Sequence, residues 1–367
     1  MITIISCIFV LATLVQLLYW LLVFSRLARY YPPKPTDDKE IPVSIVICAR
    51  NEAENLKKNL PRILNQNYRS FEVIVVNDQS TDETENILLN FNIEYPILHV
   101  LTIRDRPENR PGKKYALAQG IHTAKHEVLL LTDADCTPAN PMWLRNMQKT
   151  IRQPIAIGLG FAPYEKRKGM LNRFIRFETV YTALQYLSFA LIGQPYMGVG
   201  RNLVYKKSLF ESTNGFRQHE TIASGDDDLF INAVADAQNT SIILDPSTFM
   251  YSEPEATWKN YYFQKSRHYT TGKHYKRKHQ ILLGLLSISH FLHYLGGIVL
   301  LIQFSTMFVS IFYVARILVM AIFYRSILKK FHEDDLWLWI PVLDFALVFH
   351  FLIFAPTLMI GKTRPWK

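Results

Sequence analysis

The sequence predicts an α/β domain with a mostly parallel sheet, placed between a hydrophobic N-terminal anchor and a hydrophobic C-terminal region. Three observations support this fold class. Both ends of the 367-residue chain contain long segments with almost no charge. The middle of the chain is as charged as an ordinary soluble protein. Within the middle, short β-branched runs alternate with segments of helical apolar spacing, which is typical of a sheet flanked by helices.

The hydrophobic ends predict membrane-spanning helices. Residues 1–25 and 281–315 contain no Asp, Glu, Lys or Arg, and residues 336–361 contain only Asp344. About 20 apolar residues cross the hydrocarbon core, where a helix pairs its own backbone groups. We therefore expect one N-terminal anchor and two to three C-terminal spans. Pro341 makes the last of these a candidate for a re-entrant or interfacial segment.

The residues that flank the anchor predict its orientation. Basic residues follow the anchor, beginning with Arg26 and Arg29, and none precedes it, so we interpret it as uncleaved. Under the positive-inside rule the middle domain then lies in the cytosol, and we expect an integral protein of a bacterial inner membrane. The expected segments are an anchor at 1–25, a linker at 26–40, a cytosolic domain with an interfacial segment at 41–273, and a membrane region at 274–367.

The charge of the chain also favours a membrane partner. The formal net charge is +10, and much of it lies beside the hydrophobic segments, for example at residues 276–278. This suits an anionic inner leaflet, so we expect no nucleic acid partner. Cys7, Cys48 and Cys136 show neither metal-ligand spacing nor a disulfide framework.

The middle of the chain supplies its strands and helices in alternation. The expected strands are residues 43–48, 71–76, 97–103, 127–132 and 155–161. The expected helices are residues 53–64, 82–90 and 115–124. Polar clusters follow three of the strands, at residues 49–52, 77–82 and 133–135. Because ligands of such sheets bind outside the carboxyl ends of the strands, we expect these clusters to converge on one edge.

Two carboxylates directly follow the fourth expected strand. Asp133 and Asp135 flank Ala134 and would repel each other. A hard divalent cation between them and a diphosphate would relieve this repulsion. The alternative is an ordinary acidic turn, since the pattern Asp-x-Asp is common by itself.

Two further polar residues are candidates for nucleotide contacts. Asp78 ends the second strand region, where a carboxylate can accept hydrogen bonds from a base or ribose. The alternative there is a turn or helix cap. Lys113 precedes a helix and could meet phosphate or a carboxylate, although spacing alone favours a solvated lysine.

Two later segments carry further charged candidates. Residues 226–228 are three adjacent aspartates before a helix, where acids also serve as caps. Three acids exceed what a cap needs, so one is a candidate general base. Gln264 and Arg267 lie among aromatic residues. That stretch is also typical of a basic interfacial segment, although a guanidinium suits diphosphate.

Together and in this order, these segments resemble inverting family 2 glycosyltransferases of the GT-A fold. The matching segments are VSIVICARNE at 43–52, VVNDQSTD at 75–82, GKKYAL at 112–117, LTDAD at 131–135, GVGRN at 198–202, SGDDDL at 224–229 and QKSRH at 264–268. Each motif is weak alone, whereas seven in register are specific.

The resemblance implies a nucleotide-diphosphate sugar donor, usually a UDP-sugar, and a divalent cation, Mg²⁺ or Mn²⁺. The implied donor-binding residues are Ala49, Glu52 and Asp78 for the nucleoside, Lys113 near the nucleotide, Asp133 and Asp135 for sugar and metal, and Gln264 and Arg267 in the Q-x-x-R-W motif. His268 replaces the tryptophan of that motif. The motif is typical of polymer synthases, but three or four spans are too few for a polymer channel.

The resemblance also implies catalytic and acceptor residues. The family's base is the second acid of a Glu-Asp pair, and counting back from Leu229 places it at Asp226. Gly225 replaces the glutamate, so Asp227 stays a competitor. Asn202 matches a residue in the segment near the acceptor.

The hypothesis is a single displacement at the anomeric carbon, with a lipid or lipid-linked acceptor. Two alternatives belong to other classes. A catalytically silent scaffold of a glycan-assembly complex would lack transfer activity. A transporter would need a polar site within the spans. The only charged candidates there are Arg316 and Asp344, which could instead pair with each other.

Overall fold

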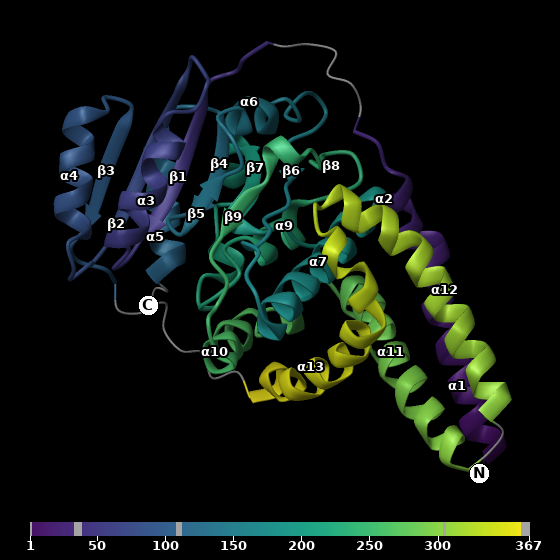
Figure 1. Cartoon of the computed structure of the whole chain (residues 1–367). Helices are drawn as coiled ribbons and strands as arrows, with labels where there is room; N and C mark the ends of the chain where they lie inside the picture. The colour runs from purple at the N-terminus through teal and green to yellow at the C-terminus, as the bar shows by residue number, and fades with distance from the viewer. Residues whose placement is uncertain (1, 33–38, 108–111, 304–305, 361–367) are drawn as a thin grey trace.

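A seven-stranded sheet lies at the centre of the water-facing domain (Figure 1). The computed structural model describes residues 2–32, 39–107, 112–303 and 306–360. The strands are β1 Val43–Ala49, β2 Phe71–Asp78, β3 Leu98–Ile103, β4 Val128–Asp133, β6 Ile157–Leu159, β7 Leu203–Lys206 and β8 Thr240–Ile242, in the order β3-β2-β1-β4-β7-β6-β8. The first four are mutually parallel, which confirms a mostly parallel sheet. Only β7 runs antiparallel to its neighbours within this sheet, and β5 (Cys136–Pro138) pairs with β9 (Met250–Ser252) in a second, two-stranded sheet.

The register of the parallel strands brings the three polar clusters together. Ala49 of β1 is paired with Asn77 of β2, and Cys48 of β1 is paired with Asp133 of β4. The carboxyl ends of these strands therefore lie at one edge of the sheet. The expected convergence of the polar clusters is confirmed.

Alternate residues of β1 enter two different cores, as the period of a strand requires. Ile45 and Ile47 pack with α3 (Ala53–Leu64) on one face. Val46 and Cys48 pack with α5 (Gly112–Thr123) and α7 (Met170–Leu191) on the other. The remaining helices of the domain are α4 Thr84–Glu94, α6 Trp143–Gln148, α8 Lys207–Ser212, α9 Asp228–Val234 and α10 Trp258–His268.

The long helix α7 has no counterpart among the sequence-based predictions. Most of its 22 residues are buried, on several sides of the helix. A helix that is buried all round lacks the one-sided apolar spacing that marks a surface helix. This explains why periodicity did not reveal it.

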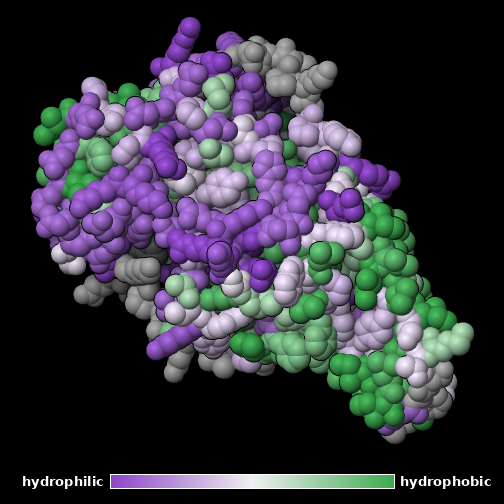
Figure 2. All heavy atoms as spheres, in the orientation of Figure 1, coloured by the Kyte–Doolittle hydropathy of each residue, from purple (hydrophilic) through white to green (hydrophobic). Residues whose placement is uncertain are grey.

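Among the described residues, four helical segments are long and apolar enough to cross a membrane, judged by length and composition. They are the N-terminal segment of α1 Ile2–Leu18, a π-helical turn Tyr19–Phe24 and α2 Ser25–Arg29; α11 Arg277–Gln303; α12 Thr306–Lys330; and the 3-10 helix η6 Asp334–Trp339 followed by α13 Ile340–Ile360. Figure 2 shows hydrophobic residues gathered over these helices, while the sheet domain is mostly hydrophilic. The first segment continues four residues past the expected boundary at 25. Residues 33–38 of the expected linker lie outside the described residues.

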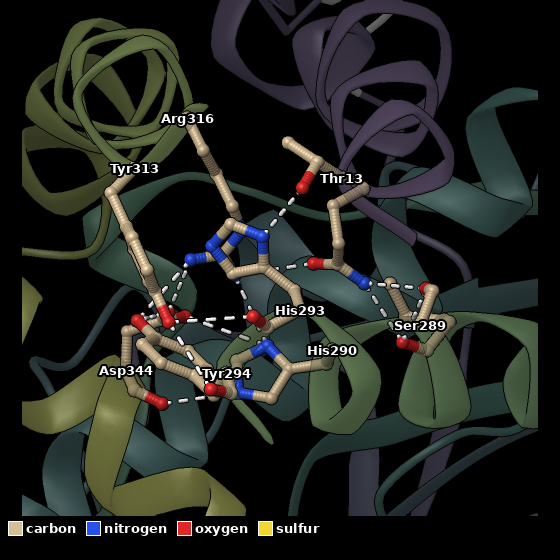
Figure 3. Close-up of polar contacts among 10 residues, drawn as sticks. Thr13, Ser289, His290, His293, Tyr294, Tyr313, Arg316 and Asp344 are labelled. Carbon is tan, nitrogen blue, oxygen red and sulfur yellow. Dashed lines mark hydrogen bonds and ion pairs between the residues drawn. The ribbon is translucent and has the colours of Figure 1, made fainter. Parts of the chain in front are cut away.

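A network of buried polar side chains joins the long helices (Figure 3). Arg316 of α12 is paired with Asp344 of α13 at 2.7 Å, which confirms that these two charges meet. The Arg316 guanidinium also bonds to Gln16 of α1 at 3.2 Å, and to His290 and Tyr294 of α11 at 3.1 and 3.3 Å. The positive charge of Arg316 and the negative charge of Asp344 neutralise each other, because an unpaired charge among apolar helices would be costly.

Candidate active site

One cavity of about 450 Å³ lies at the carboxyl edge of the sheet. It is lined by residues from the ends of β1 and β4, the start of α5, the loop before α9, and α10. Its lining includes eight predicted site residues: Glu52, Lys113, Asp133, Asp135, Asp226, Asp227, Gln264 and Arg267. The fold therefore gathers most of the predicted site in one place.

Lys113 connects two of the predicted acidic motifs. Its ammonium nitrogen lies 3.0 Å from Asp133 Oδ1 and 3.1 Å from Asp226 Oδ2. Burial alone would lower the pKa of Lys113, but the two carboxylates raise it well above its usual value. Lys113 is therefore a charged member of the site, rather than the solvated lysine that spacing alone favours.

The residues of the Asp-x-Asp motif suit a divalent cation. Asp133 and Asp135 both line the cavity. Burial, and then the charge of Asp133, raise the pKa of Asp135, so a cation between the two carboxylates would relieve a repulsion. In the described part of the chain, no group of three or more His, Cys, Asp and Glu side chains could hold a metal. Two carboxylates are nevertheless enough for Mg²⁺ or Mn²⁺ when phosphate oxygens and water complete the shell.

The three acids before α9 have different partners. Asp226 forms the ion pair described above. Asp227 accepts a hydrogen bond at 2.7 Å from the backbone N–H of Gly200, and another from the N–H of Asp228. Asp228 accepts a hydrogen bond at 2.7 Å from the Tyr275 hydroxyl. Asp227 is thus the N-cap of α9, and Asp228 is held by Tyr275, although both also line the cavity. Asp226 and Asp227, the two acids that the sequence indicates as candidate bases, both lie in the cavity.

The pKa values of these two candidates are shifted in opposite directions. Burial would raise the pKa of Asp226, but the charge and hydrogen bond of Lys113 outweigh it and hold this pKa below its usual value. Burial, together with the charges of Asp226 and Asp228, raises the pKa of Asp227 to about 7. Asp226 is therefore ionised throughout the neutral range, whereas Asp227 titrates within it.

The residues predicted to hold the nucleoside lie beside the cavity. Ala49 and Asp78 are fully buried and do not line it, whereas Glu52 does. Asp78 accepts a hydrogen bond at 3.0 Å from Arg106. Burial raises the pKa of Asp78 despite this partner. Its other oxygen, Oδ1, is buried with no hydrogen-bond partner among the described residues, so it is an acceptor that a ligand could use.

Asn202 and its neighbour Arg201 point to opposite sides. Asn202 is fully buried, and its amide nitrogen donates to the carbonyls of Phe161 and Thr248 at 2.8 and 2.7 Å. Its side chain therefore braces the domain and does not line the cavity. Arg201 does line it, with its guanidinium 4.4 Å from the centre of the Tyr164 ring. Arg201 belongs to the same Gly198–Asn202 motif, but only the fold shows which of its residues faces the site.

Helix α10 contributes the residues of the last motif. Gln264 accepts a hydrogen bond from Tyr164 at 3.5 Å and donates to Glu255 at 3.4 Å. Arg267 is half-buried and lines the cavity on the same side. Between them, Lys265 forms a buried ion pair with Glu178 of α7. This pair fixes α10 against α7, and so positions the two motif residues.

The cavity does not end at the acids. Its lining continues along α7, which contributes Tyr181 and Tyr186. It reaches Leu283 of α11 and Leu347 and Phe351 of α13. Two of the helices that are apolar enough to cross a membrane therefore form the far end of the cavity. The sequence contained no signal for this extension, because α7 was not predicted.

Comparison with known proteins identifies the domain. The model of the family "Glycosyl transferase family 2" matches residues 44–212. Residues 44–212 therefore resemble a family 2 glycosyltransferase domain. The chain is 26% identical over 276 residues to the probable glycosyltransferase YdaM of Bacillus subtilis, and 28% identical over 176 residues to the dolichyl-phosphate β-glucosyltransferase ALG5A of Trichomonas vaginalis. These matches cover 69% and 41% of this chain, but only 62% and 53% of those two proteins.

A solved structure of similar fold supports the same architecture for this chain. The mannosyltransferase PcManGT from Pyrobaculum calidifontis, in complex with GDP-Man and Mn²⁺, matches with a TM-score of 0.63. The match covers 99% of this chain and 100% of that chain, at 16% sequence identity. At that identity the likeness concerns the fold alone, and it confirms the GT-A-like architecture.

Proposed function

We propose that this glycosyltransferase moves a sugar, with inversion, from a nucleotide-diphosphate donor to a lipid or lipid-linked acceptor at the cytosolic membrane face. The observation that carries the proposal is that one continuous cavity runs from the acids at the sheet edge to α11 and α13. A soluble donor can enter at the polar end while a membrane-borne acceptor approaches from the apolar end. The named activity of the dolichyl-phosphate β-glucosyltransferase relative supports a lipid acceptor. We expect a UDP-sugar as the donor.

The proposed chemistry is a single displacement. The acceptor hydroxyl oxygen bonds to the anomeric carbon while the bond to the diphosphate oxygen breaks, so the configuration inverts. Asp226 takes the hydroxyl proton, and Asp227 is the competing base. Lys113 and Arg267 place positive charge beside the leaving diphosphate.

The remaining site residues hold the donor in this proposal. Ala49, Glu52 and Asp78 surround the nucleoside, and Oδ1 of Asp78, which has no hydrogen-bond partner among the described residues, is suited to accept a hydrogen bond from it. Gln264 orients the donor from α10. Asp133 and Asp135 would hold the divalent cation, which supplies further charge neutralisation to the diphosphate when bound.

A donor screen tests the function. Membranes that contain the protein are incubated with radiolabelled UDP-sugars and GDP-sugars and Mn²⁺ or Mg²⁺, and the lipid fraction is analysed. New labelled glycolipid with one added sugar is the expected result. Labelled polymer would favour a processive synthase, and no labelled product from any donor would favour the silent scaffold.

A substitution series tests the base. Asp226→Asn should abolish transfer while donor binding is retained. Glu54→Gln, which alters an exposed acid on α3, should leave both unchanged. Full transfer by a folded Asp226→Asn variant would remove Asp226 from the mechanism. Loss of donor binding in that variant would instead assign Asp226 to the donor site.

A further inference from the structure

The last helix, α13, differs in direction from the other long apolar helices. Figure 1 shows α1, α11 and α12 side by side, running away from the sheet domain. In the same view α13 runs across this bundle toward α10. All four segments are long and apolar enough to cross a membrane. The different direction of α13 is therefore explained by the residues that α13 contacts.

The segment that leads into α13 is bound to the sheet domain. Asp335 of η6 accepts hydrogen bonds from Lys166 at 2.8 Å and from Arg176 at 2.5 Å. The adjacent Glu333 accepts one from Arg176 at 2.8 Å. Arg176 lies on α7 and Lys166 in the loop before it, so α13 starts from the catalytic side of the molecule.

The distal part of α13 is bound to the same domain. The ring of Phe354 stacks on Tyr262 and Tyr269, with centroid distances of 5.3 and 5.4 Å. His350 is bonded to the Tyr269 hydroxyl at 2.8 Å. Tyr262 lies on α10, the helix that brings Gln264 to the cavity. Both ends of this segment therefore contact the catalytic domain.

These contacts are incompatible with a membrane crossing by α13. A 21-residue helix rises about 30 Å, close to the thickness of the hydrocarbon core. If α13 crossed, Phe354 would lie on the opposite side of the membrane from Asp335. The structure instead places both residues against the domain that contains the acids of the site.

The outward face of α13 is apolar. Val342, Phe349 and Ile353 are exposed by 56, 53 and 54%. On the opposite face, Leu347 and Phe354 are at most 3% exposed. Figure 2 shows hydrophobic colouring that continues from the bundle onto this region. A helix that is apolar on its outward face, beside three apolar helices, is suited to lie in lipid.

We propose that α13 lies along the membrane surface on the catalytic side, with its outward face in the acyl chains and its inward face closing the apolar end of the cavity. The chain then has three crossings, and its C-terminus lies on the same side as the catalytic domain. The sequence after α13 contains Lys362, Arg364 and Lys367, and basic residues beside a hydrophobic segment favour the cytosolic side under the positive-inside rule. The arrangement holds whatever sugar or acceptor the enzyme uses.

Depth measurements test the proposal, with α12 as a matched control. Spin labels are placed at Val342→Cys and Ile353→Cys on α13, and at Ile311→Cys and Ile322→Cys on α12. Each pair is 11 residues apart, about 16 Å along a helix, and all four positions are exposed by 54 to 68%. The background variant is Cys7→Ser, because Cys7 is exposed while the other two cysteines are buried.

The labelled full-length protein is reconstituted in vesicles of phosphatidylcholine and phosphatidylglycerol. Accessibility to oxygen and to a water-soluble nickel complex reports the depth of each label. We expect equal, shallow depths for the α13 pair and clearly different depths for the α12 pair. A difference within the α13 pair as large as that within the α12 pair would overturn the proposal.

A second measurement does not depend on the labelled variants. A protease-cleavable tag is fused to the C-terminus of the full-length chain, and the orientation of the catalytic domain is mapped with a tag in the 33–38 segment. We expect both tags on the same side of the membrane. A C-terminal tag on the opposite side would overturn the proposal.

Discussion

The pH dependence of transfer can distinguish the two candidate bases. The neighbouring Lys113 holds the pKa of Asp226 below its usual value, so Asp226 is ionised at every pH between 6 and 8. Burial and the flanking acids raise the pKa of Asp227 to about 7. If Asp227 were the base, only about one tenth of the enzyme would hold an ionised base at pH 6. The rate would then fall about tenfold from pH 8 to pH 6.

With Asp226 as the base, we expect the rate of the chemical step to change less than about twofold between pH 6 and pH 8. The assay is single-turnover transfer at saturating donor and cation, so that binding steps do not contribute. The control is Asp227→Asn, which should keep the flat profile because it removes only the group that titrates near 7. A tenfold fall in the wild-type rate from pH 8 to pH 6, together with loss of transfer in Asp227→Asn, would refute the assignment of Asp226.

Three further predictions concern other parts of the molecule. Lys113→Met should lower kcat/KM by about 100-fold, as expected for loss of one charged group beside the leaving diphosphate, and a change below about threefold would contradict its role. Asn202→Ala should lower the free energy of unfolding by about 2–4 kcal/mol, because two buried carbonyls lose their hydrogen-bond donor. Arg201→Ala should mainly lower the rate of transfer. If Arg201→Ala destabilised the protein and Asn202→Ala lowered only transfer, the two roles would be exchanged. In the buried ion pair, Arg316→Met and Asp344→Leu should each destabilise the protein by about 3 kcal/mol, because each leaves one charge unpaired. The stability of the double variant should be closer to that of the wild type. Additive losses of stability in thermal unfolding would show that the two residues are not coupled.

The positions of the polar clusters could be predicted from the sequence for a simple reason. Strand and helix alternation implies a parallel sheet, and the carboxyl ends of parallel strands share an edge. Asp78, Asp133 and Glu52 each follow or end a strand, so their convergence needs no knowledge of packing. The motif Gly198–Asn202 is less informative. Its spacing does not show that Arg201 faces the cavity while Asn202 lies in the core.

The α/β class, the hydrophobic ends and the edge of the sheet where the site lies can all be predicted from the order of residues along the chain. Those features depend on local spacing, which a chain carries along its length. The pairing of Lys113 with Asp226, the extension of the cavity along α7 and the direction of α13 become visible only in the folded chain. Each of these depends on contacts between segments far apart in the chain, such as the ion pair of Asp344 with Arg316. Apolar composition alone does not distinguish a helix that crosses a membrane from one held along its surface.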